Sequence, residues 1–224
     1  MKKYKISIIV LMFLSLLITS VCLLFLGDSI PTHIGINGEP DMFGSKFFML
    51  LFPCISIIIG TIMLLVSKFA KVSENYNKYM LMTGVILQLT FISVNVTFII
   101  VALLYNENQP EFDVSKIMMI IMGSMLILMS NFMPKIEKNR TLGLKTRWSM
   151  YNEVTWQKSH RFVGIVGMIA GLLILISGVF FKDMVNFIIL ISLVLIVVIS
   201  ATIASYVYYR QEKNKEKIKN TSNE

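Results

Sequence analysis

Six long apolar runs constrain the fold of this chain more than any other feature of its sequence. They cover residues 6–26, 47–66, 80–104, 117–133, 162–181 and 184–207, and none of them contains Asp, Glu, Lys, Arg or His. A helix needs roughly 20 apolar residues to cross the hydrocarbon core of a bilayer, with about 17 to 25 tolerated. A charge at the bilayer centre costs about 2.5 kcal/mol or more, so this segregation is typical of membrane spans. The sequence predicts an all-α polytopic membrane protein with six transmembrane helices.

The overall composition excludes an ordinary soluble domain. Hydrophobic residues make up 55% and charged residues 15% of the chain, against about 45–50% and about 25% in soluble proteins. The first apolar run follows Lys2, Lys3 and Lys5 and is 21 residues long, whereas the apolar part of a signal peptide has about 7 to 15. No small-x-small cleavage site follows it, so we expect it to remain as the first span.

The distribution of basic residues predicts the orientation in the membrane, because cytoplasmic flanks carry the excess of Lys and Arg. With the N-terminus inside, 18 of the 21 basic residues lie on the inner side, while the acidic residues divide into 6 inside and 7 outside. The sequence therefore predicts six spans with both termini in the cytosol. The net charge of +8 then reflects contact with the lipid bilayer, and no direct nucleic-acid partner is expected.

The runs divide the chain into four regions. We expect the first two spans in 1–66 with an outer loop at 28–46, the third span and its flanking loops in 67–116, and spans four to six in 117–207 with an inner loop at 134–161. The last region, 208–224, is rich in Lys, Glu and Asn without apolar periodicity. It is expected to be a solvated cytosolic tail without regular structure.

Polar side chains within the spans are few. Gln88 and Asn95 lie seven residues apart on one helical face, and Asn186 opens the sixth run. These amides can line a path, which leads to the alternative hypothesis of a small-solute or ion permease, or they can form hydrogen bonds between helices. The spans lack the ionisable residues that mark proton relays and ion-coupled carriers, which favours hydrogen bonding between helices.

Small residues and cysteines leave two packing questions open. The fifth run carries glycines on one stripe, at 164, 167, 171 and 178, which predicts close packing against the sixth span or, alternatively, a homodimer contact. Cys22 and Cys54 are expected at comparable depth, as packing thiols or as a bridged pair. The chain has no CxxC motif and no Cys/His cluster, so we expect no metal site and no cofactor.

The outer loop, 28–46, is rich in turn residues. Pro31, Pro40 and the pair Asn37–Gly38 favour a compact loop, in which residues 33–36 can form one arm of a hairpin. Four side chains are competent to bind a cation if they converge, namely Asp28, His33, Glu39 and Asp41. The alternative is a structural loop or one that faces a partner.

The inner loop, 134–161, contains both tryptophans and seven basic residues of the chain. Gly143 predicts a turn, and Asn152 is a suitable N-cap for a helix that continues into the fifth span. On that helix Trp156 and His160 are spaced i, i+4 and face the same way. The loop can anchor the chain at the membrane interface or present a docking surface to a cytosolic partner.

Two segments resemble the SdpI family of bacterial six-span membrane proteins. The outer segment reads Pro31-x-His33, Asn37-Gly38-Glu39-Pro40-Asp41 and Ser45-Lys46, and it is similar to the DUF1648-like domain of these proteins. The inner segment reads Asn139-x-x-Leu142-Gly143-Leu144-x-Thr146-x-Trp148, followed by Glu153, Trp156 and Arg161-Phe162. The chain has Lys145 where the family usually has Arg, and Arg147 where it usually has Pro.

The resemblance implies a non-enzymatic role in the bacterial cell membrane. It implies immunity to a secreted peptide toxin, and signal transduction by holding a cytosolic ArsR-type repressor at the membrane. The candidate partner-binding residues of the inner loop are Asn139, Leu142, Gly143, Lys145, Thr146, Trp148, Glu153, Trp156 and Arg161. The candidate outer-loop motif consists of Pro31, His33, Gly38, Pro40 and Asp41.

Overall fold

The computed structural model describes residues 1–69, 73–105, 113–139 and 141–221. Its helices are α1 (Lys2–Cys22), α2 (Leu51–Phe69), α3 (Glu74–Leu104), α4 (Val114–Phe132), α5 (Glu153–Phe180) and α6 (Asp183–Thr221), with short 3₁₀ turns η1 (Lys46–Leu50) and η2 (Met133–Lys135). Strands β1 (Ser29–Ile34) and β2 (Pro40–Ser45) form a small antiparallel sheet. Six helices of the described chain are long and apolar enough to span a membrane, which confirms the predicted fold class.

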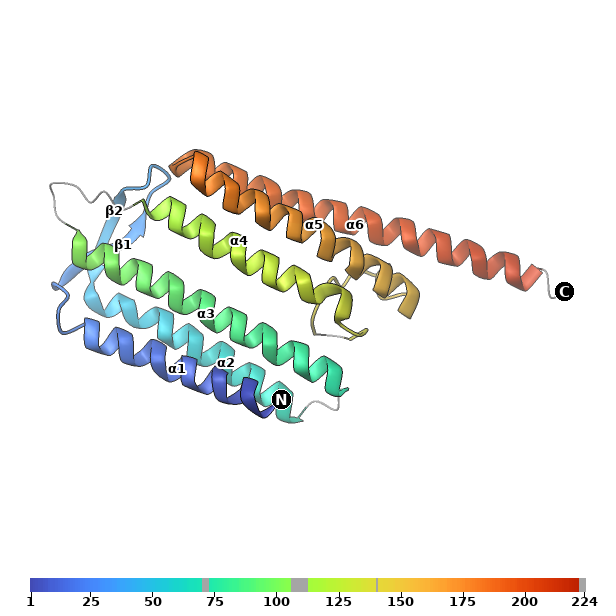
Figure 1. Cartoon of the computed structure of the whole chain (residues 1–224), viewed down its shortest axis with the longest axis horizontal. Helices are drawn as coiled ribbons and strands as arrows, with labels where there is room; N and C mark the ends of the chain where they lie inside the picture. Colours follow the sequence, from blue (N-terminus) through green and yellow to red (C-terminus); the bar gives the residue numbers. More distant parts are fainter. Residues whose placement is uncertain (70–72, 106–112, 140, 222–224) are drawn as a thin grey trace.

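The helices form an antiparallel bundle with two distinct ends (Figure 1). The β-hairpin lies at one end, which we call the hairpin end, and both chain termini lie toward the other, the terminal end. Helices α1, α2 and α3 pack mainly on one another, as do α4, α5 and α6, and α3 and α4 join the two groups. The segments that are rich in Lys and Arg, including the inner loop 134–161, therefore gather at the terminal end.

Side-chain caps explain where several helices begin. Ser73 Oγ accepts a hydrogen bond from Tyr76 N at 3.1 Å, at the start of α3. At the start of α5, Asn152 Oδ1 accepts from Thr155 N at 2.8 Å, and Thr155 Oγ1 accepts from Asn152 N at 3.1 Å. This reciprocal pair satisfies two backbone donors that the helix leaves free. The predicted cap at Asn152 is confirmed.

The glycine stripe of α5 packs on α4 rather than on α6. A Cβ added at Gly171 would lie 2.7 Å from Ile127 Cγ1 and 2.9 Å from the carbonyl oxygen of Gly123. Gly164 lies against Pro134 and Gly178 against Met119 in the same way. Only glycine permits backbones to approach this closely. The expected α6 partner was therefore wrong, and because α4 covers the stripe, a second copy of the chain cannot use it.

The buried amides connect α3 to its two neighbours. Gln88 Nε2 donates to the carbonyl oxygen of Ser56 on α2 at 2.7 Å, and Ser56 Oγ donates back to Gln88 Oε1. Asn95 Nδ2 donates to Thr19 Oγ1 on α1 at 2.7 Å. These contacts support the expectation of hydrogen bonds between helices. They hold the first three helices together with polar groups that lipid could not satisfy.

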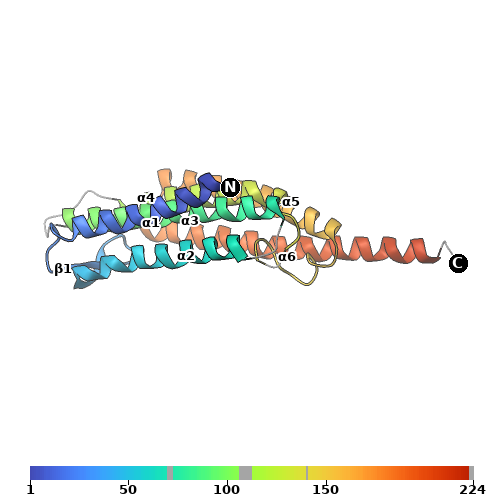
Figure 2. The same cartoon turned by 90° about the horizontal axis from the view of Figure 1, so that it is seen from below.

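The C-terminal region differs from the unstructured tail that the sequence predicted for 208–224. Helix α6 continues to Thr221 and projects beyond the rest of the bundle (Figures 1 and 2). Glu212 explains part of this continuity, because its Oε1 accepts from Lys158 Nζ at 2.8 Å and from Lys215 Nζ at 3.1 Å. Such i, i+3 pairs support a helix, and the contact to Lys158 attaches it to α5.

The two cysteines, Cys22 and Cys54, are free thiols and do not form the bridge that the sequence left open.

Candidate functional site

The inner segment, 134–161, is folded tightly against the terminal end of the bundle, and Asn139 organises its first turn. Asn139 Oδ1 accepts from the backbone N–H groups of Thr141 and Leu142 at 2.8 and 2.7 Å, while its Nδ2 donates to the carbonyl oxygen of Glu137 at 2.8 Å. Asn side chains favour such local turns. The turn directs Leu142 onto the apolar cluster around Ile8 and neighbouring residues of α3.

Gly143 and His160 form the centre of this segment. Gly143 has a φ of +99°, and a Cβ added there would overlap Nε2 of His160. The backbone N–H of Leu144 donates to that Nε2 at 3.0 Å, and His160 Nδ1 lies 2.9 Å from the carbonyl oxygen of Trp156. Nε2 therefore has no proton and Nδ1 has one, so the ring is neutral. A buried neutral imidazole here links the turn to α5.

Trp156 lies on the same face of α5 as His160, as predicted. The two rings stack with centroids 3.8 Å apart, and Trp156 Nε1 donates to the carbonyl oxygen of Ile136 at 2.7 Å. Both side chains are fully buried, with 0% of their surface exposed. Trp156 was predicted to bind a cytosolic partner or to anchor the chain at the membrane interface. Its burial excludes direct contact with a partner and with lipid headgroups. It stabilises the segment instead.

A third set of contacts attaches the segment to α6. Thr146 Oγ1 lies 3.0 Å from Ser205 Oγ, and the ring of half-buried Trp148 meets Tyr206 edge-on at 5.1 Å. Ser149 completes the turn, because its Oγ accepts from the N–H of Thr146 at 3.0 Å. The sequence did not single out Ser149, nor the contact of Ser205 with Thr146. Ser205 lies 59 residues from Thr146, and no local sequence pattern predicts a contact between residues so far apart.

The structure divides the nine predicted inner-loop residues into two groups. The residues that pack within the protein are Asn139, Leu142, Gly143, Thr146, Trp148 and Trp156. Lys145, Glu153 and Arg161 are exposed, as is Arg147. Of the nine candidates only Lys145, Glu153 and Arg161 are charged, and all three are exposed. Six of the nine candidate residues are therefore used in packing, and partner binding by the three exposed ones stays a prediction.

Glu137 connects the inner segment to the start of α3. Its Oε1 accepts from Asn75 Nδ2 at 2.9 Å, and its Oε2 accepts from Ser73 Oγ. The hydrogen bond from Ser73, and then that from Asn75, lower the pKa of Glu137 below its ordinary value. The carboxylate is therefore ionised at neutral pH and bridges the two groups of helices at the terminal end.

The outer-loop motif forms the β-hairpin, as the turn residues predicted. The turn places Gly38 at a φ of +80°, and Gly35 N donates to the carbonyl oxygen of Glu39 at 2.7 Å. Pro31 is buried on β1 and Pro40 begins β2. A proline fits at the first position of a strand because it has no N–H to donate. The motif is therefore an ordered element.

The acidic side chains of the hairpin take separate partners. His33 Nδ1 lies 2.6 Å from Asp41 Oδ1 across the two strands. Asp28 pairs with Lys46 at 3.0 Å, and Glu39 Oε2 accepts from Asn37 Nδ2 at 3.3 Å. Within the described residues no three His, Cys, Asp or Glu side chains are placed to hold a metal ion. These side chains do not converge on one cation.

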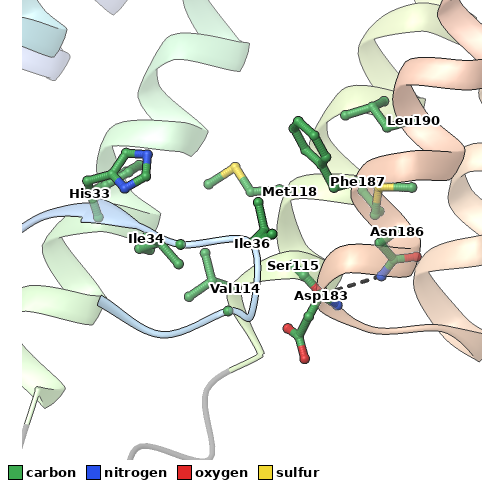
Figure 3. Close-up of a pocket in the computed structure, with 14 residues that line it drawn as sticks. His33, Ile34, Ile36, Val114, Ser115, Met118, Asp183, Asn186, Phe187 and Leu190 are labelled. Atoms are coloured by element: carbon green, nitrogen blue, oxygen red, sulfur yellow. Dashed lines mark hydrogen bonds between the residues drawn. The ribbon is translucent and has the colours of Figure 1, made fainter. Parts of the chain in front are cut away.

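A cavity of about 370 Å³ lies between the hairpin, α4 and α6 (Figure 3). The hairpin contributes residues 33–36 and Gly38, and the helices contribute apolar side chains such as Met118 and Phe187. Gly38 approaches Asp183 so closely that an added Cβ would overlap its carboxylate. The turn and the first residue of α6 therefore meet at the rim of this cavity. No sequence pattern predicted the cavity, because its walls are far apart in the chain.

Fold and composition define the class of the protein as a six-helix polytopic membrane protein. Residues 135–208 match the SdpI/YfhL protein family, and residues 10–57 match the domain of unknown function DUF1648. The resemblance noted in the sequence is thus confirmed: the chain is similar to the SdpI/YfhL family over residues 135–208, and the DUF1648 match precedes this segment.

Two individual proteins are also similar to this chain. The chain is 28% identical to the "Immunity protein SdpI" of Bacillus subtilis over 212 residues, which cover 94% of this chain and 98% of that protein. It is also 42% identical over 43 residues to an uncharacterised protein of Archaeoglobus fulgidus, covering 19% of this chain and 24% of that one. No solved structure matches the chain. The likeness to the Bacillus protein therefore includes both the hairpin and the inner segment.

Proposed function

We propose that this protein is an integral membrane immunity protein that protects a bacterium against a secreted peptide toxin. The observation that carries the proposal is the likeness to the Bacillus immunity protein along 94% of the chain. The aligned length includes all six helices, so the similarity extends over the whole architecture and is not confined to one motif. The work of such a protein is binding and signalling rather than catalysis.

The proposed site of action is the bacterial cell membrane, with both termini in the cytosol. The basic segments gather at the terminal end of the bundle, and the hairpin end carries more acidic than basic residues. This asymmetry supports the orientation, since positive flanks are retained on the cytosolic side. The hairpin then faces the toxin, and the inner segment faces the cytosol.

Survival of a toxin-sensitive strain tests the immunity role. A Bacillus strain that lacks its own immunity protein would express this chain and be exposed to a series of SDP-like secreted peptides. We expect growth at peptide concentrations that kill cells expressing an unrelated six-span protein at the same membrane level. Equal killing of both strains by every peptide would refute the immunity role.

We also infer that the exposed side of the inner segment holds a cytosolic ArsR-type repressor at the membrane. Lys145, Glu153 and Arg161 support this, because they are charged and exposed, whereas their neighbours are used in packing. Replacing Lys145 and Arg161 with Glu should release the repressor of the same operon from the membrane fraction. Lys116→Glu changes an exposed charge at the hairpin end and serves as the control. Unchanged sedimentation in the double variant would refute the docking role.

A further inference from the structure

The cavity at the hairpin end has the form of a binding site for an apolar group. Its volume of about 370 Å³ falls within the roughly 300–1,000 Å³ that ligand pockets occupy. Ile36 of the hairpin, Met118 of α4 and Phe187 of α6 face one another around it (Figure 3). One wall belongs to the DUF1648 region and the other to α4 and α6. A bound group would therefore contact both parts of the molecule.

The rim of the cavity carries an unpaired negative charge. Asp183 lines the cavity beside Gly38, and within the described residues no Lys, Arg or His lies within ion-pair distance of its carboxylate. Asp28, by contrast, is paired with Lys46 at 3.0 Å. Among the described residues, the loops and helix ends at this end of the bundle contain 5 acidic and 3 basic side chains. The charge at the rim is thus complementary to a cationic group and repels an anionic one.

The floor of the cavity contains a polar side chain. Asn186 is only 1% exposed and lines the cavity, where its Nδ2 donates to the carbonyl oxygen of Phe181 at 2.9 Å. Its Oδ1 is buried and has no hydrogen-bond partner among the described residues. Buried polar atoms ordinarily have a partner. Because this oxygen is covered by the protein itself, Asn186 adds no accessible acceptor, and the cavity offers apolar contacts beside the charge at its rim.

We propose that this cavity binds a cationic, apolar peptide segment, with an apolar side chain in the cavity and a Lys or Arg on Asp183. The inference deepens the proposed immunity function, on which it rests, by naming the site and the chemistry of the peptide it receives. A phospholipid is the competing occupant. The acidic rim disfavours phospholipids with anionic headgroups, because it repels their charge. The peptide would approach from the side on which the hairpin lies.

Direct binding tests the site with probes of defined chemistry. The full chain in phosphatidylcholine nanodiscs would be titrated with a labelled leucine–tryptophan peptide flanked by lysines, and with its counterpart flanked by glutamates. Empty nanodiscs give the background. We expect saturable binding of the lysine-flanked peptide only, because the glutamate-flanked peptide meets the same charge at the rim.

Two pairs of variants locate the binding. Asp183→Asn removes the rim charge and tolerates the positive φ of this residue, and it should weaken binding about fivefold. Asp28→Asn removes one charge of the same end away from the cavity and should leave the affinity unchanged. Met118→Trp fills the cavity and should abolish binding, while Ile120→Trp, which lies outside this cavity on the same helix, should not.

The outcomes separate this inference from the proposed function. Absence of saturable binding to the wild type, or equal affinity of Asp183→Asn, Met118→Trp and the wild type, would overturn the site even if cells survive the toxin. A phospholipid that co-purifies with the wild type and is lost from Met118→Trp, without peptide binding, would identify lipid as the occupant and also overturn it. Failure of survival with intact peptide binding would overturn the immunity role alone.

Discussion

At the scale of single residues, a few side chains hold the inner segment to α5. His160 accepts the N–H of Leu144 with one ring nitrogen, while the other nitrogen bonds the carbonyl oxygen of Trp156. Gly143 lies so close to Nε2 of this ring that a side chain there would overlap it. The segment is therefore shaped by packing contacts, and its glycine and tryptophan are needed for the fold before they can serve any partner.

Replacing Gly143 with Ala should destabilise the protein. Its φ of +99° places a Cβ-bearing residue in a strained region that costs roughly 1–2 kcal/mol, and the new methyl group would also displace His160. We expect a lower melting temperature than that of the wild type when thermal unfolding in detergent is monitored by tryptophan fluorescence. Gly27→Ala is the matched control, because its nearest neighbour is an oxygen at 3.8 Å. Equal melting temperatures for both variants would contradict the described geometry.

Trp156→Phe isolates one hydrogen bond. The ring is largely retained, but the carbonyl oxygen of Ile136 loses its donor at 2.7 Å, and a buried acceptor without a partner costs about 1–3 kcal/mol. Trp148→Phe should cost less, because Trp148 is half-buried and contacts Tyr206 through its ring. Denaturant titration of both variants checks this order. A reversed order would show that Trp156 is not the structural residue.

At the scale of elements, the tightest association in the membrane is that of α4 with α5. Gly171→Val should force the two helices apart, because its Cβ would lie 2.7 Å from Ile127 and 2.9 Å from a backbone oxygen. Overpacking of this kind costs roughly 1–3 kcal/mol. Ile169→Val on the lipid-facing side of α5, where the side chain is 55% exposed, is the control. Thermal stability in nanodiscs should fall in the first variant only.

The contact of Glu137 with α3 should make stability depend on pH. Hydrogen bonds from Ser73 and Asn75 lower the pKa of Glu137 in the folded state. A lowered folded-state pKa stabilises the protein above the unfolded-state pKa, and the contribution is lost as pH falls through the folded-state value. Glu137→Gln should therefore be less stable than the wild type at neutral pH, and the difference should shrink in acid. Melting curves across this pH range would contradict the account if the difference stayed constant.

Periodicity and composition were enough to predict the elements, but not which of them pack together. The six helices, the cap at Asn152 and the hairpin turn at Asn37–Gly38 depend on local chemistry and were visible in the sequence. The glycine stripe was visible as well, but its partner was assigned to α6. Small residues on one helix show that a close partner exists without showing which helix supplies it. The helical continuation to Thr221 depends partly on the contact between Lys158 and Glu212, which are 54 residues apart.

At the scale of the whole molecule, two groups of three helices meet at α3 and α4. The DUF1648 region, 10–57, lies within the first group, and the family segment, 135–208, begins at the end of η2 and includes α5 and most of α6. The hairpin of the first group reaches across to α6 at Asp183, and the inner segment reaches back to α3 through Glu137. Each group therefore contacts the other at both ends of the bundle.

The candidate sites show the same limit of sequence reasoning. The inner-loop residues were grouped through their resemblance to the SdpI family, yet burial separates those that pack from Lys145, Glu153 and Arg161. The cavity at the hairpin end was not predicted, because Ile36, Met118 and Phe187 come from three separate elements. Local patterns carry information on turns and caps, whereas exposure and cavities follow from tertiary packing.

The orientation in the membrane is the claim on which the proposed functions depend most directly. Single cysteines would be introduced at Asn37, exposed in the hairpin turn, and at Gln157, exposed on α5, in a variant with Cys22 and Cys54 replaced by Ala. Intact cells would then be treated with a membrane-impermeant maleimide. We predict labelling of Asn37→Cys in intact cells and of Gln157→Cys only after permeabilisation. Labelling of Gln157→Cys in intact cells, with Asn37→Cys protected, would contradict the account.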